Sequence, residues 1–266
     1  MDRRKAVALG DFDGMHLAHK TVVTGAKDVT IYCVNNRFSL LQKSIFEERF
    51  PNAVFADFDT IKNLSADEFV NVILIDELGA EMLLCGYNFR FGKGAKWSAF
   101  DLRRMLEERD VWVRILEHQD FEGAPISSSR IRACIRDGEI EKANEMLGYP
   151  FTFESVVEHG DARGRTIGFP TANQHLPAGL MMPKFGVYQS FALIDGKRYK
   201  AFTNIGIRPS WQVDEPIAET HIFDFDGALY GRVVRLELVK YLRGEMHFAS
   251  VEELKEQLTH DKSSII

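Results

Sequence analysis

A glycine-rich loop in the second half of the chain combines residue types that bind phosphate with residue types that bind a metal ion. Its sequence is GDARGRTIGFPTAN. Glycines let backbone amides approach a phosphate closely, so Gly164, Arg165 and Gly168 are predicted to bind the phosphates of a nucleotide. Thr171 and Asn173 alternate along an extended piece, so their oxygens point to the same side. A hydroxyl and an amide carbonyl suit Mg²⁺, which bridges substrate phosphates, and the pair is therefore a predicted magnesium site.

Two histidines in the first half lie where the start of a helix would bind an anion. The sequence GDFDGMHLAH follows an apolar run and carries His16 and His19 at the opening of a predicted helix. Free backbone N–H groups attract anions there, and histidine donors can hold a triphosphate and stabilise charge on the transferred phosphorus. Gly10 and Phe12 belong to the same predicted phosphate-binding turn. The alternative is a pair of ordinary histidines at a helix start.

Two further segments of the first half suit a nucleotide. ISSSRIR places the hydroxyls of Ser127 and Ser128 beside Arg130 and Arg132 at another predicted helix start. Hydroxyls and backbone amides bind phosphate oxygens, and arginine adds a charge-assisted fork. GYNFRFG follows a predicted strand and mixes aromatic rings with asparagine and arginine. Taken singly, the first segment also reads as a helix cap with two surface arginines, and the second as a loop with buried rings.

The pattern of the first 148 residues predicts an α/β domain. Predicted strands lie at residues 5–9, 29–34, 53–56, 81–86 and 111–116, and predicted helices at 17–25, 39–50, 66–78 and 98–109. This alternation favours a parallel sheet with helices on both faces. Two more helices, at 128–137 and 139–147, are each closed by a glycine. We therefore place the domain boundary after Gly148, so that the two domains span residues 1–148 and 149–266.

The pattern changes after residue 150. β-rich runs lie at residues 151–159, 186–194, 198–206, 217–223 and 231–241. An Asp-Gly pair within LIDGKRYK predicts a hairpin between two of them. Short strands at this spacing predict a small antiparallel β-barrel. A terminal amphipathic helix is predicted at 250–259, with Ser250 as its cap and Glu253 at the capping-box position.

Composition narrows the class of protein. The formal net charge of −6 argues against nucleic acid as a partner, because phosphate-backbone binding needs a basic face. Cys33, Cys85 and Cys134 are far apart and predict neither a disulfide framework nor a zinc site. No signal-peptide pattern and no run of about 20 apolar residues is present. We expect a cytoplasmic protein that acts on small molecules, without membrane or nucleic acid, as a monomer or weak homo-oligomer.

Several motifs after residue 150 resemble those of riboflavin kinases. GRTIGFPTAN is similar to the signature GRxxGFPTAN, and KFGVY, NIGIRPS, ETHI with DF, LYG and LR with a later phenylalanine resemble further family segments. The resemblance implies ATP-dependent phosphorylation of riboflavin to FMN. It gives Glu219, on a predicted strand, the role of general base for the attacking hydroxyl. It also implies that Arg243 lies in a segment over the flavin.

The three segments of the first half together resemble the adenylyltransferase half of the prokaryotic bifunctional riboflavin kinase/FAD synthetase family. That half has HxGH and ISSTxxR signatures in a Rossmann-like domain, and it transfers AMP from ATP to FMN with release of pyrophosphate. The residues that the resemblance assigns to the ATP phosphates are His16, His19, Ser128 and Arg132. Asn88, with Phe89 beside it, is implied to line the flavin or nucleotide site.

The first half also departs from this family pattern. Ala18 replaces the glycine of HxGH, and IYCVNNRF stands where the family carries a TFDPHP-like segment. The short connection after His19 also predicts a stunted first helix. The leading reading is a bifunctional enzyme, and the alternative is a monofunctional riboflavin kinase with a structural N-terminal domain. Retention of Thr171, Asn173 and Glu219 argues against a third reading, a flavin-binding regulator.

Overall fold

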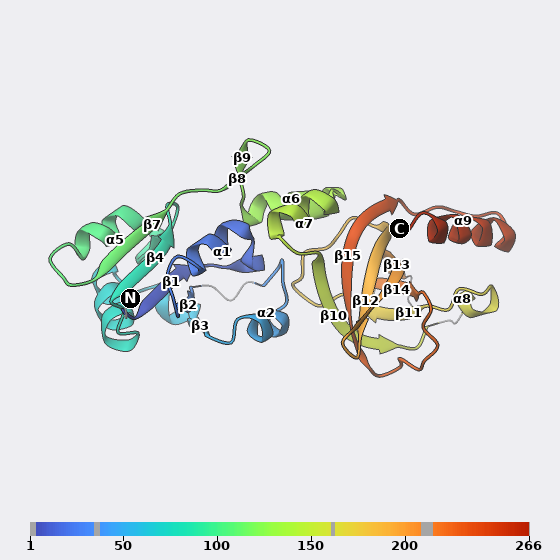
Figure 1. The fold of residues 1–266 in the computed structure, drawn as a ribbon, viewed down its shortest axis with the longest axis horizontal. Coiled ribbons are helices and arrows are strands. Elements are labelled where there is room, and N and C mark those ends of the chain that lie inside the picture. Colours follow the sequence, from blue (N-terminus) through green and yellow to red (C-terminus); the bar gives the residue numbers. More distant parts are fainter. Residues whose placement is uncertain (1–3, 35–37, 161–162, 209–214, 266) are drawn as a thin grey trace. The chain divides into compact units, whose positions relative to one another are not determined.

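The computed structural model describes residues 4–34, 38–160, 163–208 and 215–265, and the chain forms two compact units (Figure 1). Unit 1 comprises Met1–Phe38 and Lys43–Ser128, and unit 2 comprises Ser39–Gln42 and Ser129–Ile266. Parts of three motifs quoted above lie outside the described residues: Asn35 to Arg37, Asp161 with Ala162, and Pro209 with Ser210.

Unit 1 contains the predicted parallel sheet. Its strands are β1 (Ala6–Gly10), β2 (Thr30–Cys33), β3 (Ala53–Phe55), β4 (Met82–Gly86) and β7 (Trp112–Leu116). They lie in the order β3-β2-β1-β4-β7, and every pairing is parallel. The order reverses between β1 and β4, which are hydrogen-bonded neighbours. In open α/β sheets, ligands bind outside the carboxyl ends of the strands at such a switch point.

The helices of unit 1 follow the predicted alternation. They are α1 (Leu17–Val23), α2 (Lys43–Arg49), α3 (Phe58–Ile61), α4 (Ala66–Glu68) and α5 (Ala99–Met105). The predicted stunted first helix is confirmed, since α1 has seven residues. One predicted helix differs in kind, because α4 continues as the π-helix η2 (Phe69–Glu77). Short turns and hairpins complete the unit: η1 (Asp13–Met15), β5 (Arg90–Phe91), η3 (Lys93–Ala95), β6 (Trp97–Ser98), β8 (Asp120–Phe121) and β9 (Ala124–Pro125).

Unit 2 is built on a closed six-stranded antiparallel barrel, which confirms the predicted barrel. Its strands are β10 (Phe151–Glu158), β11 (Ala172–His175), β12 (Gly186–Ile194), β13 (Lys197–Arg208), β14 (Glu215–Ile222) and β15 (Val233–Arg243). Their order is β10-β11-β14-β13-β12-β15, closed by pairing of β15 with β10. Asp195 and Gly196 both have positive φ in the two-residue turn between β12 and β13, as the predicted hairpin requires.

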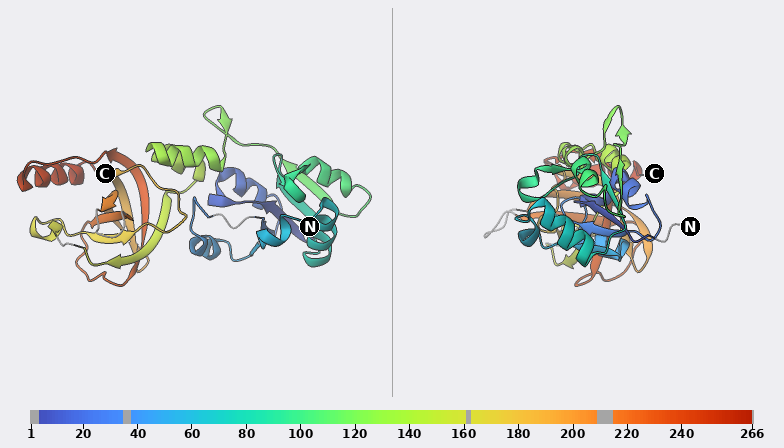
Figure 2. Two further views of the ribbon diagram at one scale, coloured as in Figure 1. Left: turned by 180° about the vertical axis from the view of Figure 1, so that it is seen from behind. Right: turned by 90° about the vertical axis from the view of Figure 1, so that its left-hand side faces the viewer.

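Four helices belong to or begin at this unit. They are α6 (Ser128–Asp137), α7 (Ile140–Leu147), α8 (Arg163–Thr166) and α9 (Val251–Ser263). Figures 1 and 2 show α8 and α9 at the same end of the barrel. Helix α7 contacts β10 and β15, and Asn144 on it donates to the carbonyl of Leu238 at 2.8 Å and accepts from the amide of Phe151 at 2.7 Å. Contacts therefore divide the chain before α6, whereas our sequence-based boundary lies after α7.

A short segment of the first half forms hydrogen bonds with strand β10 of the barrel. The side-chain amide of Gln42 donates to the carbonyl of Glu154 at 2.9 Å and accepts from its backbone N–H at 2.6 Å. Residues 39–42 therefore count with unit 2 although unit 1 continues at Lys43. No helix within the described part of the chain is both long enough and apolar enough to cross a membrane.

Candidate functional site

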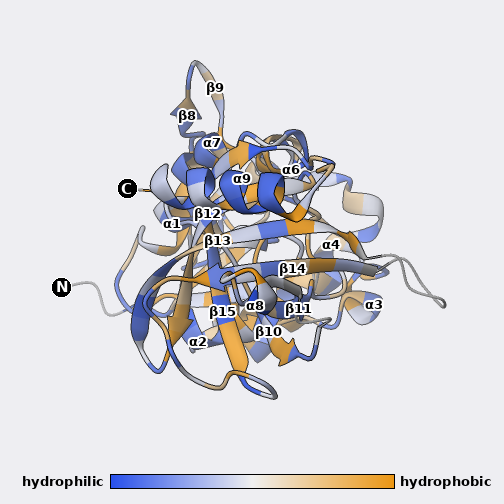
Figure 3. Ribbon diagram, turned by 90° about the vertical axis from the view of Figure 1, so that its right-hand side faces the viewer, coloured by the Kyte–Doolittle hydropathy of each residue, from blue (hydrophilic) through white to orange (hydrophobic). Residues whose placement is uncertain are grey.

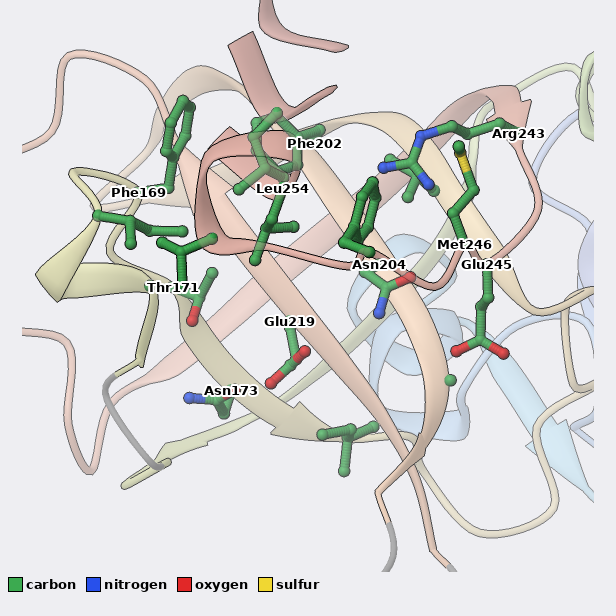
Figure 4. A pocket seen from close by; sticks show the side chains of 18 of the residues that line it. Phe169, Thr171, Asn173, Phe202, Asn204, Glu219, Arg243, Glu245, Met246 and Leu254 are labelled. Atoms are coloured by element: carbon green, nitrogen blue, oxygen red, sulfur yellow. The ribbon is translucent and has the colours of Figure 1, made fainter. Parts of the chain in front are cut away.

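A cavity of about 880 Å³ opens at the end of the barrel near α8 and α9 (Figure 4). One part of its lining is polar and the other is apolar. The polar lining comprises Thr166, Thr171, Asn173, Asn204, Glu219, Arg243 and Glu245. The apolar lining includes Ile167, Phe169, Phe202, Met246, Phe248, Val251, Leu254 and Leu258. A ligand with one polar and one apolar part suits such a cavity.

Strand register brings three polar side chains into one row. Asn173 on β11 is paired with Glu219 on β14, and Glu219 is paired with Asn204 on β13. Directly opposite residues of antiparallel strands present their side chains on the same face. Figure 4 shows Glu219 and Asn173 side by side. Thr171, the residue just before β11, lies near them. Thr171, Asn173 and Glu219 therefore line one cavity, as their assignment to one site requires.

Asn173 has an unsatisfied oxygen that suits a metal ion. Its side chain is 8% exposed, and its Oδ1 atom is buried with no hydrogen-bond partner among the residues that the structure describes. A buried polar atom without a partner costs about 1–3 kcal/mol, so a bound partner would be expected there. The amide oxygen of Asn173 and the hydroxyl of Thr171 are both hard ligands. The donor set therefore fits Mg²⁺.

The described part of the glycine-rich loop after Arg163 is held by hydrogen bonds within the segment. Residues of α8 form one helical turn, and the carbonyl of Gly164 accepts from the amides of Ile167 at 3.2 Å and Phe169 at 2.8 Å. A Cβ at Gly164 would lie 2.2 Å from the carbonyl oxygen of Phe169, so only glycine fits. Gly168 has φ of +88° with open space around it, and needs glycine for its backbone conformation. Arg165 is exposed on the same turn.

Arg243 ends β15 at the rim of the cavity, but its guanidinium is engaged within unit 2. Its Nε atom lies 3.1 Å from both carboxylate oxygens of Asp261, and its Nη2 atom lies 2.6 Å from Oδ2. The role of Arg243 in flavin binding therefore remains a prediction. In the structure, its guanidinium is paired with Asp261.

His221 is a structural residue in unit 2. Its Nδ1 atom lies 2.9 Å from the carbonyl oxygen of Pro170, and its ring packs between Phe169, Phe202 and Phe223. Burial lowers the pKa of the imidazole from its ordinary value. The hydrogen bond to Pro170 fixes the chain just before Thr171, so His221 helps to position the proposed metal ligands.

In unit 1 the two histidines face each other at the start of α1. Their rings stack with centroids 3.6 Å apart, and the Nδ1 atom of His16 accepts from the backbone N–H of His19 at 3.4 Å. His16 is 3% exposed and caps the helix. Phe12 meets the His19 ring edge-on, with centroids 5.3 Å apart. The histidines therefore form one packed cluster beyond the carboxyl end of β1.

The turn before them is shaped by unusual backbone angles. Phe12 has φ of 54° and Met15 has φ of 38°, both in the left-handed region. A Cβ at Gly10 would lie 2.9 Å from the ring of Phe12, so glycine lets the ring fold back over the strand end. The hydroxyl of Ser128 donates to the carbonyl of Asp13 at 3.4 Å, which joins the ISSSR segment to this turn. Phe12 thus contacts His19, and Gly10 and Ser128 contact the turn that precedes the histidines.

The other predicted residues of the first half lie in different surroundings. Asn88 is exposed just beyond β4, next to β1 in the sheet, and a Cβ at Gly86 would lie 3.1 Å from its Oδ1 atom. Phe89 is 7% exposed and belongs to the hydrophobic core of unit 1, where it stacks with Phe91. A ring so placed supports the loop of Asn88 from beneath. Its direct contact with flavin stays a prediction.

The helix α6 carries the basic residues of the ISSSRIR segment. Ser128 is its first residue, and Arg130 and Arg132 follow within unit 2. The Nε atom of Arg132 donates to the hydroxyl of Ser39 at 2.9 Å. Ser127 is half-buried immediately before the helix. The structure joins Ser128 to the histidine turn and Arg132 to segment 39–42.

The buried histidine cluster predicts acid sensitivity. Burial, and next the neighbouring His16, hold the pKa of His19 well below its ordinary value of 6.5. The unfolded chain therefore takes up a proton below about pH 6.5 that the folded chain does not, and stability is lost as the pH falls through that window. We expect the free energy of unfolding to fall between about pH 7.5 and about pH 5.5, and to fall less in His19→Gln. Urea titrations at both pH values check this, and an equal fall in both proteins would refute the role of His19.

The sequence alone gives no role to three residues of these sites. Asn204 begins the NIGIRPS motif, but its place beside Glu219 follows only from strand register. Gly160 matters because a Cβ there would lie 2.2 Å from the Nδ2 atom of Asn173. In the sequence, Asp261 does not differ from the other acidic residues of a polar helix, and its pairing with Arg243 is apparent only in the structure.

Comparison with known proteins agrees with both halves of this geometry. A family model described as riboflavin kinase matches residues 147–265, and one described as FAD synthetase matches residues 31–130. The barrel with its cavity and the parallel sheet therefore define a protein with a riboflavin kinase domain and an FAD synthetase domain. Proteins named bifunctional riboflavin kinase/FMN adenylyltransferase from Listeria monocytogenes and Bacillus subtilis are each 31% identical. The alignments cover 98% of this chain and 91% of the Listeria protein, and 99% of this chain and 92% of the Bacillus protein.

The chain belongs to the bifunctional riboflavin kinase/FMN adenylyltransferase family. Its fold is also similar to that of a crystal structure from Streptococcus pneumoniae that is described as a macrolide-efflux protein. That similarity has a TM-score of 0.88 at 29% identity, and covers 99% of this chain and 94% of the other.

Proposed function

We propose that this protein makes FMN from riboflavin in unit 2 and FAD from FMN in unit 1, with ATP as the co-substrate of both reactions. Membership of the family and the presence of both matching regions support the two activities together over a kinase alone. We further propose that it acts in the cytoplasm on these small molecules, as a monomer or weak homo-oligomer. The net charge of −6 supports substrates of this kind over nucleic acid.

The row of Asn173, Glu219 and Asn204 beside an apolar wall is the observation that carries the kinase activity. Riboflavin has a flat, largely apolar ring system and a polyhydroxyl chain that ends in the reacting 5′-hydroxyl. The apolar lining suits the ring, and the polar row suits the hydroxyl chain. Such an orientation brings the 5′-hydroxyl to Glu219, whose carboxylate would take its proton as the oxygen attacks the γ-phosphorus of ATP. The bond from that phosphorus to the β,γ-bridging oxygen breaks, and ADP leaves.

Residues of the glycine-rich loop and of the strand that follows it would position the nucleotide. The backbone of Gly164 and Gly168 and the side chain of Arg165 would hold the phosphates of ATP. Thr171 and Asn173 would hold Mg²⁺, which when bound neutralises charge on the transferred phosphoryl group. The carbonyl of Pro170, held by His221, keeps this strand in place. Positioning and neutralisation are the main requirements of phosphoryl transfer.

The adenylyltransferase activity is supported by the position of the histidine cluster. His16 and His19 lie beyond β1, and Asn88 lies beyond the neighbouring strand β4, at the switch point of the sheet. The histidines and Ser128 would bind the triphosphate and stabilise charge as AMP is transferred to FMN with loss of pyrophosphate. Ser127, which precedes α6 in unit 1, would contribute to the same site, and the roles of Arg130 and Arg132 remain predictions from the sequence. Asn88 would contact the flavin or the nucleotide, above the ring of Phe89.

Chromatographic separation of flavins tests the proposal directly. The protein is incubated with Mg²⁺ and ATP, and with either riboflavin or FMN. We expect FMN and FAD from riboflavin, and FAD from FMN. If the protein makes FMN from riboflavin but no FAD from FMN, unit 1 has only a structural role. If it turns over neither flavin, both activities are excluded.

The contact between Gly160 and Asn173 gives a prediction for the metal site. In Gly160→Ala the new Cβ would lie 2.2 Å from the Nδ2 atom of Asn173, so the amide must move. A shift of about 1 Å in a positioning group can cost about 10²-fold in rate, and we expect a loss of that order in FMN formation. The loss should shrink as Mg²⁺ is raised, which a metal titration of the rate measures.

Gly179→Ala is the matched control for this prediction. Gly179 lies in the same unit with φ of +80° and nothing within 4 Å of a Cβ, so alanine there costs stability without touching the cavity. FMN formation should stay near the wild-type rate. Equal losses in both variants would show that Gly160 acts only through folding.

A further inference from the structure

The helix α9 forms one wall of the barrel cavity although it buries little apolar surface. Val251, Leu254 and Leu258 line the cavity, yet Val251 is exposed and the other two are half-buried. Figure 3 shows most of the helix in the colour of hydrophilic residues. In α9, which the structure describes along its whole length, Asp261 is the one buried residue. Apolar burial is the usual force that docks a helix, but in α9 it is limited mainly to Leu258, which packs against the cluster of Phe202 and Phe223, so a further attachment is expected.

Asp261 supplies that attachment. It is 3% exposed and receives three hydrogen bonds from Arg243, of which the shortest measures 2.6 Å. The side-chain amide of Gln257, one turn earlier, donates to its Oδ1 atom at 2.8 Å. A carboxylate and a guanidinium matched in this way form a strong, orientation-specific pair. Because Arg243 ends β15 at the cavity rim, the pair fastens α9 to the edge of the cavity.

A second contact defines where the helix can lie. Ile265, just after α9, is buried in a cluster with Phe169, Val187, Phe202 and Phe223. The last turn of α9 is therefore fixed by both Asp261 and the residue that follows it. The first two turns, which carry Val251 and Leu254, extend over the cavity from this fixed end.

We propose that Asp261 is a positioning residue for the flavin: through Arg243 it holds the apolar face of α9 over the cavity and so sets the affinity for riboflavin. This inference rests on the proposed kinase function. All three residues that α9 contributes to the cavity are apolar, so the helix acts on the ring system of the substrate. Asn173 and Glu219 lie on β11 and β14 and are independent of it.

Asp261→Asn tests the proposal, because asparagine keeps the shape of the side chain and removes its charge. We expect the KM for riboflavin to rise roughly tenfold, while kcat and the KM for ATP change little. Direct riboflavin binding, followed by quenching of flavin fluorescence, should weaken by a similar factor. Amide hydrogen exchange should quicken in α9 and remain unchanged in the barrel strands. Glu256→Gln, which removes the same charge from an exposed position of the same helix, is the matched control and should behave as wild type.

Several outcomes would overturn the proposal. An unchanged KM for riboflavin in Asp261→Asn would do so, as would equal changes in the parameters for riboflavin and ATP, since these would indicate general loss of structure. If Asp261→Asn does not fold, Gln257→Leu, which removes only one donor from the carboxylate, should raise the KM for riboflavin by a smaller factor; no rise would again refute the role. A wild-type protein that forms no FMN would refute the kinase function itself, and the role of Asp261 with it.

Discussion

Glu219→Gln is expected to abolish most FMN formation while riboflavin still binds. Glutamine keeps the shape of the side chain and its place between Asn173 and Asn204, but it cannot accept the proton of the 5′-hydroxyl. General-base catalysis contributes about 10²- to 10⁴-fold, so the turnover number should fall by that order. Steady-state rates at saturating riboflavin and ATP measure the loss, and fluorescence quenching measures binding.

Two comparisons make this result specific. Glu145→Gln, at an exposed position of α7 in the same unit, should retain wild-type turnover. FAD formation from FMN by Glu219→Gln should also be retained, because the histidine cluster lies in unit 1. Turnover of riboflavin within roughly threefold of wild type would remove Glu219 from the role of base.

His19→Ala is expected to impair FAD formation and to spare FMN formation, the reverse of Glu219→Gln. The His19 ring is held between His16 and Phe12, and burial keeps it neutral near pH 7 through its lowered pKa, so it would bind ATP as a hydrogen-bonding group and not as a cation. Removing a donor that stabilises charge in a transition state costs about 10²- to 10³-fold. FAD formation from FMN should fall by that order, and FMN formation from riboflavin should persist.

His118→Ala is the matched control for His19→Ala. His118 is a half-exposed histidine of the same unit, with its Nε2 atom 3.5 Å from a carboxylate oxygen of Asp120. It should leave FAD formation near the wild-type rate. Full FAD formation by His19→Ala would show that the cluster only shapes the turn, and that adenylyl transfer depends on other donors such as those of α6.

The fold was largely predictable because hydrophobic periodicity is a local property of the sequence. Each strand of the parallel sheet and five of the six barrel strands lie within a few residues of their predicted bounds. The exception is β11, which has four residues and was predicted only as an extended piece. The π-helix η2 was predicted only as a helix, because a largely apolar segment such as FVNVILIDE has no clear periodicity that would distinguish a π-helix from an α-helix.

Site residues could be predicted from the sequence only where they belong to a local motif that indicates their role. Thr171 and Asn173 alternate along the chain, and both line the cavity as that alternation predicts. Asn204 depends on the register of β13 with β14, and the pair of Arg243 with Asp261 joins residues 18 apart through the packing of α9. Such contacts follow from tertiary structure, which a single sequence does not reveal.

Gln42 has a consequence for how the two halves of this chain can be separated. Its side-chain amide forms hydrogen bonds with both the N–H and the C=O of Glu154 on β10, as the backbone of a neighbouring strand would. No single cleavage of the chain therefore yields two complete pieces, since a fragment that begins at Ser129 keeps α7 but leaves both groups to water or to a new partner. A net hydrogen bond is worth about 0.5–1.5 kcal/mol, so the isolated barrel should be less stable by roughly 1–3 kcal/mol. Any rearrangement that separated this barrel from the first half would lose these two hydrogen bonds unless another group replaced Gln42.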